Sequence, residues 1–216
     1  MPDLSFQVQS AEPVRHAVTP TLALKLRIEN AEAQQRIHTV PLQCQVRIET
    51  ARRSYSAPEQ SRLFDLFGEP DQWGRSLSAM LWTQTSVMVP AFIGGTTVDL
   101  PIPCTYDFNI AATRYFDSLE TGDVPLCLLF SGTIFYQGQD GALQVEQVSW
   151  EKQAQFRLPV RAWKDLMQRY YPDCAWICLR KDIHDRLRQY RSQCGLPTWE
   201  EALHRLLEGA DERVTP

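Results

Sequence analysis

Residues 22–28 read Leu-Ala-Leu-Lys-Leu-Arg-Ile, so that every second side chain is a large aliphatic. Residues 40–48, Val-Pro-Leu-Gln-Cys-Gln-Val-Arg-Ile, repeat this alternation. A period of two is typical of a β-strand with one face in a core and the other in water, and it suits antiparallel sheets. We therefore predict a β-sandwich. With a further strand at residues 4–8, we expect the first fifty residues to form a strand meander.

The strand pattern continues as far as residue 158. Residues 124–136 have a continuously apolar centre, which is expected for a strand buried on both faces. Alternation also marks residues 83–89, 96–102 and 143–158. The sequence thus predicts a mainly β fold, an antiparallel sandwich of immunoglobulin-like or related Greek-key topology.

Residues 104–119 fit two patterns. Tyr106, Phe108 and Ile110 alternate as in a strand, whereas the segment from Ile110 to Leu119 also has a helical stripe. We favour a strand with an irregular end.

Residues 56–81 interrupt the strand pattern and predict a helical insertion. Ser56 and Glu59 have the spacing of a capping box, a proline lies in the first turn, and Gly68 ends the helix. A further short helix is expected from Ser76 to Leu81.

A second change of pattern follows Pro159. Residues 160–171 carry apolar side chains at helical spacing, residues 176–179 read as a short strand, and two more helices are expected at 182–191 and 198–207. The predicted organisation is a sandwich domain at 1–159, with the insertion at 56–81, and a C-terminal helical segment at 160–216 packed on it.

Composition excludes several classes of protein. Of the 216 residues, 44% are hydrophobic and 22% charged, which is typical of a globular protein, and no apolar run is long enough to span a membrane. A net charge of −4 argues against a main role in coating nucleic acid. The N-terminus lacks the features of a secretory leader, and six scattered cysteines suit free thiols, so we expect a cytoplasmic protein.

No catalytic or cofactor-binding residues are predicted. The chain has no G-x-S-x-G motif, its four histidines have no neighbouring nucleophile, and Gly94-Gly95 lacks the lysine of a phosphate-binding loop. Cys174, Cys178 and His184 form a C-x3-C-x5-H spacing that lacks a fourth ligand, so we predict no metal site there.

The best candidate contact surface is the region around the insertion, because arginine and aromatic side chains dominate interface hot spots. The alternative is that this helix only covers an open end of the sandwich. The predicted partner-binding residues are Arg52, Arg53, Phe64, Phe67, Trp73 and Trp82.

The order strand, helix, helix after residue 175 resembles a ribbon-helix-helix module. In that family, paired strands from two chains enter the DNA major groove, and Cys178 and Arg180 would face outward here. The alternative is a helical hairpin that packs on the sandwich or on a partner.

Five parts of the sequence carry a family resemblance. They are Leu4–Phe6 with Ala11–Pro13, Cys44–Ile48, Leu66–Pro70, Leu100–Phe108 and Leu129–Thr133. Together these stretches resemble an uncharacterised bacterial family over the whole chain. The resemblance implies a genetic context beside high-affinity nickel-iron hydrogenases but no active site. We therefore expect a non-enzymatic accessory or scaffold protein whose partner is a hydrogenase component, with a DNA-binding regulator or a SecB-like chaperone as alternatives.

Overall fold

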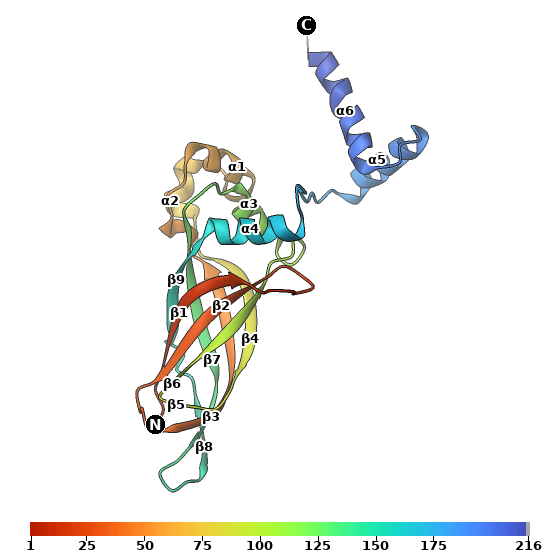
Figure 1. The fold of residues 1–216 in the computed structure, drawn as a ribbon. Helices are drawn as coiled ribbons and strands as arrows, with labels where there is room; N and C mark the ends of the chain where they lie inside the picture. Colours follow the sequence, from red (N-terminus) through yellow and green to blue (C-terminus); the bar gives the residue numbers. More distant parts are fainter. Residues whose placement is uncertain (215–216) are drawn as a thin grey trace. The chain divides into compact units, whose positions relative to one another are not determined.

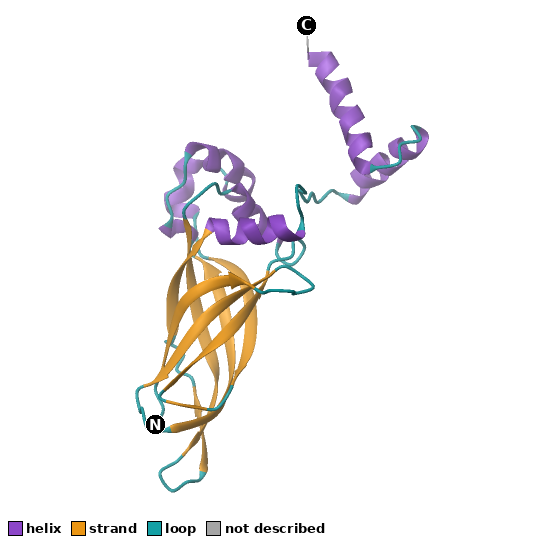
Figure 2. Cartoon of the chain, in the orientation of Figure 1, coloured by secondary structure: helices purple, strands orange, loops and turns teal. Residues whose placement is uncertain are grey.

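The protein divides into two compact units, Met1–Cys174 and Ala175–Pro216. The structure is a computed structural model that describes the backbone of residues 1–214 and the side chains of residues 1–210. The first unit is a β-sandwich with helices gathered at one end of its strands, and the second is helical (Figures 1 and 2). The helix that follows residue 159 lies in the first unit, so the division falls later in the chain than the predicted boundary.

Two antiparallel sheets form the sandwich. The smaller has the order β1 (Leu4–Pro13), β2 (Thr21–Asn30), β6 (Gly95–Pro103). The larger has the order β4 (Met80–Val89), β3 (Arg36–Ile48), β7 (Asp123–Gln137), β8 (Leu143–Gln147). In addition, β5 (Phe92–Ile93) pairs with β3, and β9 (Gln153–Pro159) pairs with β7.

The strand order confirms the predicted fold class. Strands β2 and β6 are neighbours although three strands separate them in the chain, and β3 likewise lies beside β7. Such crossovers between two antiparallel sheets are the Greek-key connections of immunoglobulin-like sandwiches.

The predicted meander of the first fifty residues is wrong, because β3 leaves the sheet that contains β1 and β2. The side chains of Leu22, Leu24, Leu26 and Ile28 on β2 are fully buried. The inward side chains of β3 are 0–2% exposed. Placing the two strands in facing sheets lets each aliphatic row cover the other, which side-by-side pairing in one sheet cannot do.

The helices at the end of the sandwich form what we call the helical cap. It consists of α1 (Ala57–Phe67), η2 (Pro70–Gln72), α2 (Trp73–Ser76), α3 (Ile110–Ser118) and α4 (Val160–Tyr170), and a short turn, η1 (Thr50–Arg52), leads into it. The capping box of α1 is confirmed: Ser56 and Glu59 bond each other's backbone N–H groups. The helix expected at 76–81 is wrong, because Met80 and Leu81 already pair with β3.

The strand favoured at 104–119 is also wrong, since α3 occupies its second half. The side chain of Asn109 accepts a hydrogen bond from the Ala112 N–H at 3.0 Å and caps the helix. Tyr115 and Phe116 are fully buried on the inner face of α3. A cap and an apolar stripe at helical spacing outweigh three alternating residues.

The second unit contains α5 (Lys181–Gln193) and α6 (Trp199–Val214). The short strand expected at 176–179 is wrong: this segment has no regular structure, and Ile177 is 71% exposed. No neighbouring strand offers it backbone hydrogen bonds among the residues that the structure describes. Within 1–214, none of the helices has both the length and the apolar character of a membrane-spanning segment.

Candidate interaction site on the helical cap

Only two of the six predicted contact residues are freely exposed. The Arg52 side chain is 63% exposed, and Phe64 is 47% exposed. Trp73 and Trp82, in contrast, are core residues with 6% and 3% of their surface exposed. The remaining two take part in the packing and polar contacts described next, so the six side chains do not form one contact surface.

One aromatic cluster packs α1 and α2 against α3. The Phe67 and Trp73 rings meet edge to face at 5.6 Å, and Trp73 also meets Tyr55 at 5.3 Å. Tyr115 lies 6.0 Å from Phe67 and completes the cluster. The indole N–H of Trp73 donates to the carbonyl of Gly68 at 3.0 Å. These aromatic residues therefore build the interior of the cap.

A second cluster joins three segments that are distant in the sequence. The ring of Phe116 on α3 lies 4.8 Å from Trp82 on β4 and is stacked 5.2 Å from Trp163 on α4. All three side chains are at most 3% exposed. Trp82 thus anchors the cap to the sandwich.

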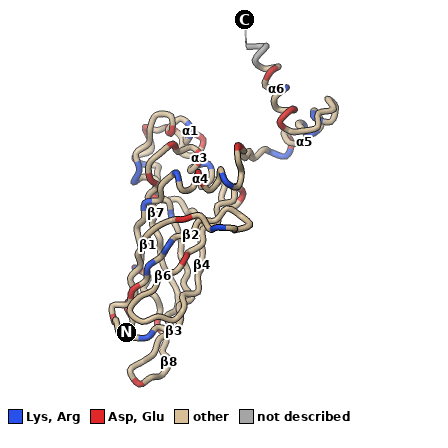
Figure 3. The backbone as a smooth tube through the Cα atoms, viewed as in Figure 1, with Lys and Arg blue, Asp and Glu red and all other residues tan. Residues whose placement is uncertain are grey.

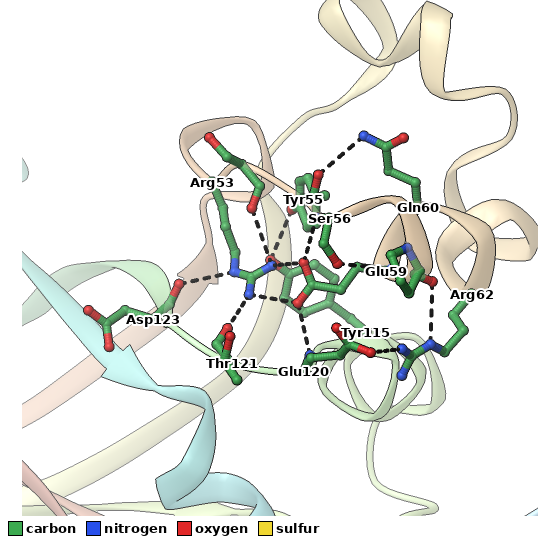
Figure 4. A network of polar contacts seen from close by, with 12 residues as sticks. Arg53, Tyr55, Ser56, Glu59, Gln60, Arg62, Tyr115, Glu120, Thr121 and Asp123 are labelled. Atoms are coloured by element: carbon green, nitrogen blue, oxygen red, sulfur yellow. Dashed lines mark hydrogen bonds and ion pairs between the residues drawn. The ribbon is translucent and has the colours of Figure 1, made fainter.

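Arg53 ties the start of the insertion to the segment before β7 (Figure 4). Its guanidinium forms two hydrogen bonds to the Glu59 carboxylate, at 2.9 and 3.1 Å. It also donates to the carbonyls of Thr121 and Asp123. The Arg53 and Glu59 side chains are only 8% and 5% exposed, so this is a buried, bidentate ion pair.

Glu59 is held in its charged form. Burial alone would raise the pKa of this carboxyl, but the Arg53 guanidinium and the N–H groups of Glu120 and Ser56, at 2.8 and 3.0 Å, together lower the pKa to about 2. The carboxylate is fully occupied as an acceptor and is not a proton donor near neutral pH. The pair is a structural tie rather than an acid-base site.

Two phenols lie behind this pair. The Tyr55 hydroxyl donates to the carbonyl of Thr50 at 2.8 Å and lies 3.0 Å from the Tyr115 hydroxyl, which therefore donates to it. Burial raises the pKa of both phenols. No buried side-chain polar atom among the described residues lacks a partner. The interior of the cap is thus complete in its hydrogen bonding.

The cysteines of the sandwich are poorly suited to nucleophilic chemistry. Cys44 and Cys104 are buried, and this burial raises the pKa of each thiol to about 12. Cys127 is also buried, with a raised pKa. The residues that the structure describes contain no group of three or more His, Cys, Asp and Glu side chains arranged to hold a metal ion.

Three exposed apolar residues occur where β4 and α3 begin, and we call them the cap-edge patch: Leu81 (44% exposed), Phe108 (50%) and Ile110 (38%). The Asn109 side-chain amide donates to the carbonyls of Leu81 and Trp82, at 3.0 and 2.9 Å. Because the same side chain caps α3, residues 108–110 are held against residues 81–82.

Sequence reasoning missed this patch because it placed residues 104–119 in a strand. Asn109 directly before a helical stripe is a recognisable N-cap signal. The contacts from Asn109 to Leu81 and Trp82 cross 28 and 27 residues, and nothing in the local sequence encodes them.

The predicted DNA-contacting residues also lie outside any strand. Cys178 is exposed, and Arg180 is paired with Asp182 at 2.9 Å. The paired strands that define a ribbon-helix-helix interface are absent from the described part of this segment.

These features define a β-sandwich protein of immunoglobulin-like topology whose strand ends are covered by a helical cap. The chain belongs to the family described as "Family of unknown function (DUF6084)", which matches residues 1–215. No curated protein matches the chain.

Two solved structures that match this chain are only distantly similar to it. The solution structure of "a putative late embryogenesis abundant (LEA) protein" is 17% identical, covers 74% of this chain and 73% of its own, and has a TM-score of 0.29. β-Glucosidase 3B from Thermotoga neapolitana, in complex with α-D-glucose, is 11% identical and has a TM-score of 0.25. That match covers 72% of this chain and 17% of the glucosidase. At these TM-scores neither structure informs the function of this chain.

Proposed function

We propose that this protein is a non-enzymatic accessory or scaffold protein that binds another protein through the helical cap. The observation that carries the proposal is the cap-edge patch, in which Leu81, Phe108 and Ile110 expose apolar surface on a well-supported frame. Protein interfaces often contain apolar side chains held on a rigid element, because such side chains lose little conformational entropy on binding.

The support beneath the patch favours recognition over chemistry. Asn109 fixes the patch residues through three hydrogen bonds, and Trp82, next to Leu81, is packed against Phe116. The titratable groups nearest the centre of the cap, Arg53 and Glu59, neutralise each other. Of the six predicted contact residues, Arg52 and Phe64 are exposed but lie outside the patch, whereas the other four act as supports.

We place the partner among hydrogenase components and the protein in the bacterial cytoplasm. The identity of the partner rests on the sequence resemblance described above. The compartment is supported by the buried, free thiols of Cys44, Cys104 and Cys127, which suit a reducing environment.

The other two hypotheses have weaker support. A ribbon-helix-helix regulator requires a strand that residues 176–179 do not form. A SecB-like chaperone requires a broad apolar groove. One groove on the larger sheet, of about 470 Å³, is instead lined largely by amide and hydroxyl side chains, including those of Gln43, Gln45, Gln84 and Ser131.

A matched pair of variants tests the proposal. Phe108 and Phe64 are exposed to nearly the same extent, at 50% and 47%, but only Phe108 belongs to the patch. We expect Phe108→Ala to reduce recovery of hydrogenase subunits by the tagged full-length protein about tenfold or more, since a hot-spot aromatic contributes about 2 kcal/mol. We expect Phe64→Ala to leave recovery within about twofold.

Circular dichroism and thermal unfolding would confirm that both variants fold. Equal recovery with the two variants and the wild-type protein would exclude the patch as the contact site. Failure of the wild-type protein to recover any hydrogenase subunit would remove the proposed partner.

A further inference from the structure

The second unit buries very little of its own apolar surface. Among its described side chains only Ala202 is buried. The helices meet through Trp199, whose ring lies 4.2 Å from the Arg191 guanidinium and 5.4 Å from the His184 ring. Both contacts involve Trp199, the first residue of α6, whereas the leucines further along α6 remain exposed.

Leu203, Leu206 and Leu207 form an apolar stripe on that uncovered part of α6. They are 42%, 39% and 66% exposed. Their spacing of three and four residues places them on one face of the helix, and Ala210 continues that face by one turn. A helix of this length is marginal in water unless such a face is buried.

Both helices carry apolar residues separated by four, three and four residues. This spacing is typical of left-handed bundles, in which side chains of neighbouring helices interlock. The residues are Ile183, Leu187 and Tyr190 of α5, with Cys194 directly after its last residue, and Trp199, Leu203, Leu206 and Ala210 of α6. One hairpin supplies two such helices, and two copies of the hairpin supply the four helices of a complete bundle.

The two helices carry opposite charge (Figure 3). Helix α5 has four cationic and two anionic side chains, a formal charge of +2, while residues 199–210 of α6 have one cationic and three anionic side chains, a formal charge of −2. When two hairpins associate about a two-fold axis, α5 of each copy can lie beside α6 of the other. The charges then favour association with a second hairpin of the same sequence.

From the stripe, the spacing and the charges, we infer that the second unit is a dimerisation module that pairs with a second copy of itself in a four-helix bundle. This inference concerns residues 181–210 and is independent of the partner proposed for the cap. In this dimer, the face of α6 that carries Leu203 and Leu206 packs against the same face of the second copy.

Sedimentation velocity of the full-length chain across a concentration series tests the inference. We expect a dimer for the wild-type protein at micromolar concentration. We expect dimerisation of the double variant Leu203→Gln, Leu206→Gln to be weaker by at least about a hundredfold, because each copy loses two buried leucines. The matched control is Leu143→Gln on β8. This substitution also replaces an exposed leucine, which is 64% exposed, but it lies outside the second unit and should leave the dimer intact.

Charge reversal provides a second test. A chain with Arg186→Glu and Arg188→Glu and a chain with Glu200→Arg and Glu201→Arg should each dimerise less tightly than the wild-type protein, while their mixture should form a heterodimer. A wild-type monomer at all concentrations, or a dimer that only Leu143→Gln dissociates, would overturn the inference. So would a mixture no more dimeric than its separate components.

Discussion

The helical cap and the C-terminal hairpin are built from similar amphipathic helices, but only the cap buries its apolar faces. In the cap, Leu63, Phe116 and Trp163 are at most 2% exposed. In the hairpin, Leu203 and Leu206 remain about 40% exposed. Since isolated helices are marginal in water, burial rather than the pattern itself determines which helices hold a fixed structure.

This difference suggests a division of roles between the two regions. The cap has a complete interior, so it can bind a partner through the cap-edge patch without rearranging. The hairpin lacks an interior of its own, and we expect its order to depend on association. The predictions below test this contrast, beginning with the largest expected effect.

Replacing Arg53 should make the cap marginally stable, as we expect the isolated hairpin to be. In Arg53→Met the Glu59 carboxylate stays buried without its cation, and we expect the free energy of unfolding to fall by about 3–5 kcal/mol. Urea denaturation followed by tryptophan fluorescence measures this loss, because Trp73 lies in the cap.

Arg62→Met is the matched control for that prediction. Arg62 also pairs with a glutamate, Glu120, but its side chain is 44% exposed, so the expected loss is below about 1 kcal/mol. If both variants lose the same amount of unfolding free energy, the buried Arg53–Glu59 pair does not stabilise the cap more than the exposed Arg62–Glu120 pair does.

Acid should weaken the cap through the same carboxylate. The pKa of Glu59 is about 2 in the folded protein and 4.5 ordinarily, so its stabilising contribution is complete above about pH 4.5 and is lost as the pH falls toward 2. The shift corresponds to about 3 kcal/mol at pH 7, of which roughly 2 kcal/mol is lost by pH 3.

The difference in unfolding free energy between the wild-type protein and Glu59→Gln isolates this contribution from those of other carboxyl groups. It should shrink by more than half between pH 7 and pH 3. A difference that stays constant over this range would contradict the depressed pKa.

The sandwich could be predicted from the sequence because its signals are local. Alternating aliphatics at Leu22–Ile28 mark a buried strand face, and Ser56 with Glu59 marks a helix start, whatever the rest of the chain does. The pairing of strands is not local. Nothing in residues 1–50 indicates that β3 pairs with β7, about 80 to 100 residues later, rather than with β2.

The candidate site was harder to predict, because core packing and interface hot spots use the same residue types. Trp73 and Trp82 look like contact residues in the sequence, and both prove to be core residues. Arg53 is predicted from the sequence to contact a partner, but its side chain is buried against Glu59 and against the Thr121 and Asp123 carbonyls, about seventy residues away. The strand expected at 176–179 failed for a similar reason, since a strand exists only where another strand pairs with it.

Removing the C-terminal hairpin from the first unit should have the smallest effect on the stability of that unit. Residues 174–180 have no regular structure and are exposed, so we expect brief trypsin treatment to cut first after Arg180 or Lys181. Because the core of the first unit lies entirely within Met1–Cys174, the large fragment should unfold within about 2 °C of the intact chain. Mass spectrometry identifies the cut and differential scanning calorimetry gives the unfolding temperature. A fall of more than about 5 °C would mean that the hairpin stabilises the sandwich directly, and its apolar stripe would then be covered within one chain rather than by a second copy.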